Sequence, residues 1–70
     1  MKRIDVVSSS LRSVGYDAAS QTLEIEFNTG TVYQYTGVPS DVYEELIAAP
    51  SHGKYFAESI KDAYPYSRIR

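Results

Sequence analysis

Cysteine and tryptophan are absent from this chain of 70 residues, and histidine occurs once, as His52. Without cysteine the chain has no disulfide framework and no thiolate ligand for a metal, which fits a reducing compartment. A zinc site needs several His, Cys or carboxylate ligands at compatible spacing, and a single histidine does not supply them. The composition therefore predicts a protein without a metal or other cofactor, and we expect it in the cytoplasm.

Long apolar runs are absent too, so the sequence has no segment of the length that a secretory signal or a membrane span requires. It also has neither the G-x-x-x-x-G-K-[ST] phosphate loop nor a G-x-S-x-G nucleophile motif. His52 falls on the inner side of a predicted helix, near its start, where packing or capping is the ordinary role of a histidine. We therefore expect no membrane contact and no enzymatic activity, and the sequence singles out no catalytic residue.

Positive charge is missing from the middle of the chain. Residues 13–53 contain no Lys or Arg, whereas both ends carry a small excess of basic residues. The net charge of −2 argues against a surface that grips nucleic acid as a whole. If the two ends lie together, they form one modestly basic face, and the alternative is ordinary solvated charge.

What the chain does contain is enough Leu, Ile, Val, Phe and Tyr to form a core, so residues 1–70 are predicted to be a single domain. Residues 11–35 have the turns and alternation of a three-stranded antiparallel meander. In the middle strand, alternation directs apolar side chains to one face and acidic side chains to the other. The apolar set is Leu23, Ile25 and Phe27, and the acidic set, Glu24 and Glu26, is interpreted as solvated surface.

The turn at 28–30 suits a three-residue hairpin with Gly30 in the left-handed position. This register opposes Ile25 to Tyr33 and Leu23 to Tyr35, which puts both tyrosines in the core. A register shifted by one residue would expose them, and exposed strand aromatics can stack on nucleic-acid bases. Tyr33 and Tyr35 are therefore candidate stacking residues only if they are exposed.

Helical periodicity follows, from about Ser40 to Ala49 and from about Ser51 to Ala63, with Pro50 and Pro65 as the stops. The predicted fold is α+β, with element order β-β-β-α-α and two short helices covering one face of the sheet. The segments 3–7 and 66–70 are each compatible with an extra strand or a frayed end.

The start of the second helix combines a hydroxyl, a glycine and a lysine, namely Ser51, Gly53 and Lys54. Free backbone N–H groups, the helix dipole and the lysine could together hold a phosphate or a carboxylate. The alternative is an N-cap whose glycine lets the two helices pack closely, and the frequency of such helix starts favours it.

Taken in order, several motifs resemble the KTSC domain, which is named for its occurrence at the C-terminus of some lysyl-tRNA synthetases and is also found as a stand-alone small bacterial protein. The resemblance runs from about Ser10 to Tyr64 and includes V-G-Y-D at 14–17, Y-Q-Y at 33–35 and S-x-G-x-Y-F at 51–56. It implies a small domain with no established activity and no catalytic residues, for which RNA binding has been suggested.

Two kinds of partner remain open. RNA would be bound weakly and in a salt-sensitive way, with phosphates held by Arg12, Lys54, Lys61, Arg68 and Arg70. A protein partner, including a second copy, would meet an exposed sheet edge or the acidic face of the first helix. A small enzyme is the third and least favoured interpretation.

Overall fold

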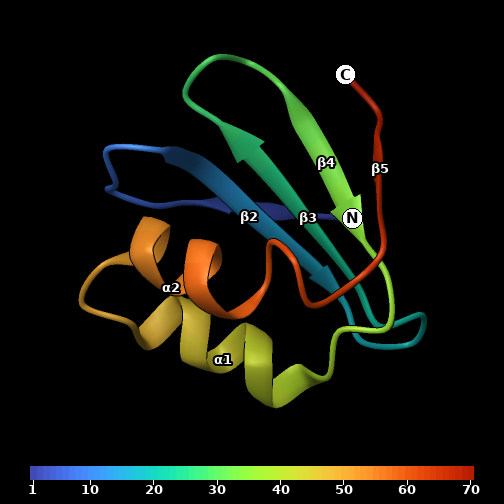
Figure 1. Ribbon diagram of the computed structural model, residues 1–70. Helices are drawn as coiled ribbons and strands as arrows, with labels where there is room; N and C mark the ends of the chain where they lie inside the picture. Colours follow the sequence, from blue (N-terminus) through green and yellow to red (C-terminus); the bar gives the residue numbers. More distant parts are fainter.

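The computed structural model describes residues 1–70, which form one five-stranded antiparallel sheet with two helices (Figure 1). The strands lie in chain order, so that β1 and β5 are the two edges. The elements are β1 (Arg3–Asp5), β2 (Leu11–Asp17), β3 (Thr22–Phe27), β4 (Val32–Tyr35), α1 (Ser40–Ala48), α2 (His52–Ser59) and β5 (Tyr66–Arg68). The α+β class is confirmed, but three strands were too few, because both ends of the chain form short edge strands.

The hairpin between β3 and β4 has the predicted register. Ile25 lies opposite Tyr33 and Leu23 opposite Tyr35. At the turn, the Phe27 N–H donates to the Thr31 carbonyl oxygen at 2.9 Å, and Gly30 has a φ of 93°. Glycine suits this left-handed position because it has no Cβ to clash with the backbone.

The helix α1 buries Leu46 and exposes its acidic residues, as its periodicity predicts. The helix α2 is shorter than predicted, because it ends at Ser59 rather than near Ala63, which is exposed. Ile60 leaves helical geometry, with φ of −120°, and is fully buried. The Lys61 N–H then bonds the Phe56 carbonyl oxygen at 2.9 Å, which closes the helix and turns the chain toward β5.

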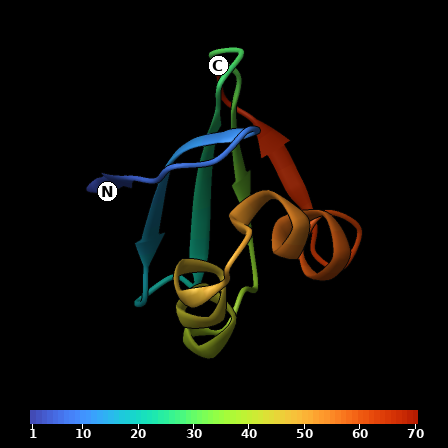
Figure 2. The same ribbon diagram turned by 90° about the vertical axis from the view of Figure 1, so that its left-hand side faces the viewer.

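The core lies between the sheet and the helices. Its largest fully buried side chains include Tyr35, Leu23, Ile25, Leu46 and Ile60. Figures 1 and 2 both show the helices at one end of the sheet, while the β3–β4 turn and the C-terminus lie together at the other end. One part of the sheet is therefore not covered by helices. Neither helix has the length and apolar character needed to cross a membrane.

Candidate functional site

The start of α2 is capped within the chain. The Ser51 hydroxyl accepts the Lys54 backbone N–H at 3.3 Å, which is the N-cap contact expected from the sequence. A Cβ on Gly53 would lie 3.2 Å from the Ser10 hydroxyl oxygen. Gly53 therefore lets the loop before β2 pack against the first turn of α2, rather than letting two helices approach each other.

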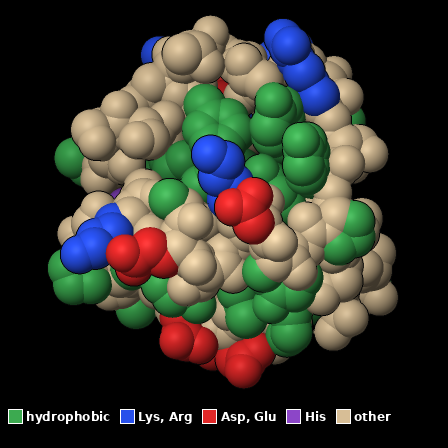
Figure 3. Space-filling model, viewed as in Figure 1, with side chains coloured by type: hydrophobic (Ala, Val, Ile, Leu, Met, Phe, Trp, Pro, Cys, Tyr) green, Lys and Arg blue, Asp and Glu red, His purple; other side chains and the backbone are tan.

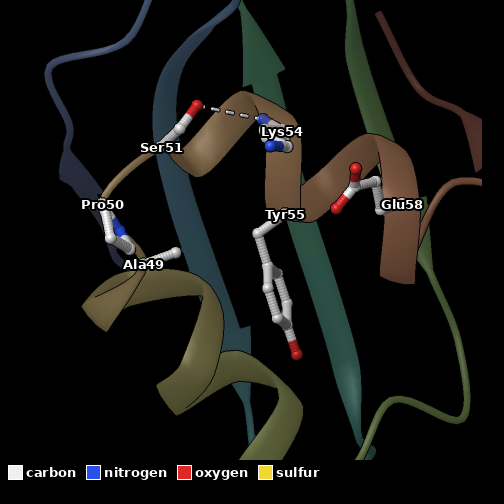
Figure 4. A pocket seen from close by; sticks show the side chains of 6 residues that line it. All are labelled: Ala49, Pro50, Ser51, Lys54, Tyr55 and Glu58. Carbon is white, nitrogen blue, oxygen red and sulfur yellow. Dashed lines mark hydrogen bonds between the residues drawn. The ribbon is translucent and has the colours of Figure 1, made fainter.

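A hollow of about 380 Å³ lies beside this helix start. Ala49, Pro50 and Ser51, from the connection between the helices, form one side (Figure 4). Lys54, Tyr55 and Glu58, from α2, form the other side. Burial raises the pKa of the Tyr55 phenol, and the Glu45 carboxylate adds to this effect. The polar side chains that line the hollow are one lysine, one glutamate, one serine and one tyrosine.

His52 has the capping role expected of it. Its Nδ1 lies 2.8 Å from the Leu46 carbonyl oxygen, so it must carry the proton that is donated to the end of α1. The Ser51 hydroxyl and the His52 ring thus bond to different backbone groups, and neither activates the other. No group of three or more His, Cys, Asp or Glu residues could hold a metal ion.

The central tyrosines differ in exposure. Tyr35 is 1% exposed, so its ring belongs to the core and the candidate stacking role is wrong for this residue. Burial raises the pKa of Tyr35 to about 12, and the nearby Tyr33, Tyr66 and Asp62 add to this effect. Tyr33 is only partly buried.

Tyr66 on β5 extends the aromatic surface to solvent. It is 57% exposed and stacks on Tyr33, with ring centroids 5.2 Å apart and planes inclined by 19°. Phe27 meets Tyr33 edge-on at 5.6 Å. We call Phe27, Tyr33 and Tyr66 the aromatic patch. Aromatic rings on an open sheet face are the kind of surface on which unpaired bases stack.

Basic side chains near the aromatic patch are few. Arg68 is exposed and lies opposite Tyr33 in the β4–β5 register. Lys61 is exposed in the turn between α2 and β5, next to Asp62. Figure 3 shows apolar side chains gathered in the middle of this face and a few separate basic side chains, two of which have an acidic side chain beside them, with further acidic side chains along the lower edge, over α1. The patch is therefore more aromatic than basic.

The face of the sheet turned away from the helices carries a network of charges. Arg3 pairs with Glu24 at 3.3 Å, and Arg70 pairs with Glu26 at 2.7 Å. Ser13 donates to Glu26 at 2.9 Å. Both glutamate side chains are only 12% exposed, so their interpretation as solvated surface is wrong. Arg3 reaches them from β1 and Arg70 from the end of the chain just after β5, and the local sequence pattern revealed neither approach.

The structure does not gather the predicted contact residues into one site. Ser51, Gly53 and Lys54 lie at the start of α2, and Lys61 follows its end. Arg68 lies by the aromatic patch, while Arg70 is bound to Glu26 on the other face. The basic residues of the two ends are therefore divided between the faces. Arg3 and Arg70 meet at Glu26, where Arg12 also lowers the pKa of the carboxyl, whereas Arg68 lies opposite Tyr33. Tyr66 was missed, although the alternation of Tyr66, Ser67 and Arg68 after Pro65 is compatible with a strand.

Known proteins are similar to this chain in sequence and in fold. The family model of the KTSC domain matches residues 7–64. An uncharacterized protein from Stutzerimonas stutzeri is 47% identical over 70 residues, and the match covers 99% of both chains. A solved structure of a KTSC domain protein from Yersinia pestis has a TM-score of 0.96 at 36% identity, covering 99% of this chain and 97% of that one.

Part of a larger protein is similar as well. A lysine–tRNA ligase from Trichormus variabilis is 43% identical over 61 residues, which are 87% of this chain and 11% of the ligase. A lysine–tRNA ligase from Nostoc punctiforme is 39% identical over 61 residues, with the same coverage. The chain thus spans about a tenth of the length of these ligases.

Proposed function

Because the chain belongs to the KTSC domain family, we propose that it is a non-catalytic binding module that holds single-stranded RNA weakly at the aromatic patch. The motifs of the sequence predicted the family membership, and the match over residues 7–64 confirms it. The proposal about RNA depends chiefly on one observation, the stack of the exposed Tyr66 on Tyr33 beside Arg68.

The chemistry of the aromatic patch favours unpaired bases. A base can stack on the exposed Tyr66 ring, which Tyr33 holds from below, and such stacking does not depend on base identity. Arg68, on the same strand, can contact a phosphate, and Lys61 is the next cation along the chain. In a duplex the base faces are already stacked on one another, so we expect single strands to bind better.

The relatives give this proposal independent support. Proteins named lysine–tRNA ligase contain a region similar to this chain, so the same domain occurs within proteins named for tRNA. We propose that this RNA binding takes place in the cytoplasm, which agrees with the lack of cysteine.

An enzyme is the less favoured alternative. The hollow at the start of α2 contains a serine, a lysine, a phenol and a carboxylate, yet Ser51 is engaged with the backbone N–H of Lys54 and no base lies against it. A nucleophile of this kind needs a base within hydrogen-bond reach. The hollow therefore supports helix packing better than catalysis.

Fluorescence anisotropy of a labelled single-stranded RNA at low salt tests the proposal. We expect Tyr66→Ala to raise the Kd about fivefold or more, because base–aromatic stacking contributes roughly 1–3 kcal/mol. Tyr66→Phe keeps the ring and should bind like the parent. Arg68→Gln should weaken binding, whereas Lys2→Gln, which removes a charge near the opposite edge of the sheet, should leave it unchanged.

Two outcomes would contradict the proposal. One is the absence of any anisotropy change at low salt and high protein concentration. The other is equal affinity of the parent and the Tyr66→Ala variant, provided that both give the same cooperative urea unfolding curve. Either result would favour a protein partner over RNA.

A further inference from the structure

The edge strand β1 has backbone groups without partners. Only β2 pairs with it. Just after β1, the Val6 N–H donates to the Arg12 carbonyl oxygen at 3.1 Å, so the backbone polar groups of Val6 face β2. These groups alternate in direction along a strand. Those of Ile4 therefore face β2 as well, and those of Arg3 and Asp5 face the open edge.

The residues of this edge are complementary to themselves. We propose that β1 pairs antiparallel with β1 of a second copy of the chain, with Ile4 on the two-fold axis. This register sets Arg3 opposite Asp5 of the second copy and, by symmetry, Asp5 opposite Arg3. The two-fold interface is isologous, so it closes as a dimer and does not propagate.

The backbone agrees with this register. Arg3 and Asp5 carry the outward-facing N–H and C=O groups, so the two Arg–Asp pairs become the hydrogen-bonded pairs of the new ladder. The Ile4 pair then occupies a narrow, non-hydrogen-bonded position, where side chains come closest. Ile4 is 41% exposed in the single chain, and this position would cover it.

Charge and apolar exposure support the same partner. Asp5 is exposed and forms no ion pair within the chain, whose ion pairs all use Glu24 or Glu26. Opposite charges placed across neighbouring strands stabilise a sheet. Met1 is 54% exposed and Val7 is 98% exposed, and the proposed register brings them opposite each other. One register thus covers Ile4 and, where the pairing continues beyond Arg3–Asp5, also Met1 and Val7. It sets the Asp5 carboxylate beside Arg3, which already contacts Glu24 of its own chain at 3.3 Å and would then lie between two carboxylates.

The other edge of the sheet fits a second copy less well. Symmetric pairing of β5 about Ser67 would oppose Tyr66 to Arg68, with no opposite charge in the register. At β1 the paired strands are short, so the contact is smaller than the roughly 1,200–2,000 Å² of a stable complex. The dimer is therefore reversible and depends on concentration.

Cysteine cross-linking tests the register in a chain that contains no cysteine of its own. The narrow pair separates Cα atoms by about 4.5 Å, within the range that a disulfide spans. We expect Ile4→Cys to form a disulfide-linked dimer under mild oxidation at low protein concentration. Ile69→Cys, at an exposed apolar residue beyond β5, is the matched control and should cross-link much more slowly. Equal, slow cross-linking of both variants would overturn the proposal.

Sedimentation equilibrium over a concentration series tests the charges. The mass of the parent should rise from 7.8 kDa toward that of a dimer. Asp5→Lys should raise the dimer Kd about tenfold or more, since it sets like charges across the axis. Asp62→Lys makes the same charge change at an exposed position away from β1 and should behave like the parent.

A parent that stays monomeric up to millimolar concentration would overturn the proposal. So would an Asp5→Lys variant that dimerises as well as the parent.

Discussion

Gly15 supports the charged face of the sheet because it has no side chain. A Cβ at this position would lie 2.8 Å from Cγ of Arg3 and 3.1 Å from the Lys2 carbonyl oxygen. Arg3, on β1, uses this space to cross β2 and reach Glu24 on β3. The ion pair between Arg3 on β1 and Glu24 on β3 thus requires a residue without a side chain at position 15 of β2, which lies between them.

Gly15→Ala should therefore displace Arg3 and the start of β1. We expect the free energy of unfolding to fall by about 1–3 kcal/mol, the usual cost of forcing extra atoms into a packed site. Urea denaturation measures it. Arg3→Ala should cost less in the Gly15→Ala background than in the parent, because the ion pair is already disturbed. Additive effects would show that Gly15 and Arg3 do not interact.

The ionisation of Glu26 makes the stability of the fold depend on pH. The hydrogen bond from Ser13 lowers the pKa of the Glu26 carboxyl below 4.5, with further contributions from Arg3 and Arg70, while burial opposes the shift. The folded state therefore favours the ionised form. The stabilisation is present above the unfolded pKa and is lost as the pH falls through the folded one.

The urea midpoint of the parent should accordingly decrease as the pH falls below about 4.5. Glu26→Gln removes the titrating group, so its midpoint should start lower at neutral pH and change less in acid. Glu58→Gln, at an exposed carboxylate on α2, is the control and should follow the parent. Parallel pH profiles for the parent and Glu26→Gln would rule out this role.

At the scale of elements, the local ones could be predicted from the sequence. The β3–β4 hairpin was found with its register because the turn at 28–30 and the alternation of Leu23, Ile25 and Phe27 are close in sequence. The helices were found from their periodicity and from Pro50. The end of α2 was placed too late, because the burial of Ile60 interrupts the helix and periodicity alone does not contain that contact.

The edge strands could not be predicted in this way. β1 and β5 have three residues each, and β5 pairs with a strand more than thirty residues earlier in the chain. Such a short segment has little pattern of its own and is fixed by its partner. Tyr66 and the aromatic patch depend on that pairing, so the candidate site was recognised only in part, through Tyr33 and Arg68.

The cap of α2 gives a prediction at this scale. Ser51→Ala removes the acceptor for the Lys54 N–H and should lower the free energy of unfolding by about 1 kcal/mol. Ser9→Ala, at an exposed serine outside the elements, should have little effect. If RNA binds at the aromatic patch, Ser51→Ala should leave its Kd unchanged. A loss of RNA affinity without a loss of stability would instead indicate that RNA binds at the start of α2.

At the scale of the whole molecule, two of the seven basic residues, Arg3 and Arg70, form ion pairs. Arg3 and Arg70 approach Glu24 and Glu26 from opposite edges of the sheet. Lys61 and Arg68 remain as the cations nearest to the aromatic patch in sequence and in register. The proposed RNA contact must therefore depend more on stacking than on charge.

The salt dependence of the RNA Kd measures how much of the binding depends on charge and how much on stacking. Two phosphate contacts on a single strand predict that a fourfold rise in salt weakens RNA binding about sevenfold. Arg68→Gln should reduce this dependence, because it leaves one contact. A much steeper dependence in the parent would mean that further cations, such as Lys54 or Arg12, also contact RNA.

The opposite placement of β1 and β5 has a consequence for avidity. Two chains joined edge to edge at β1 would carry their Tyr66 rings on the same face of one continuous sheet, at its two far edges. A transcript with a single accessible stretch would occupy one end only. A longer one, with two stretches at the matching span, would be retained by both ends and released more slowly than either weak contact alone allows.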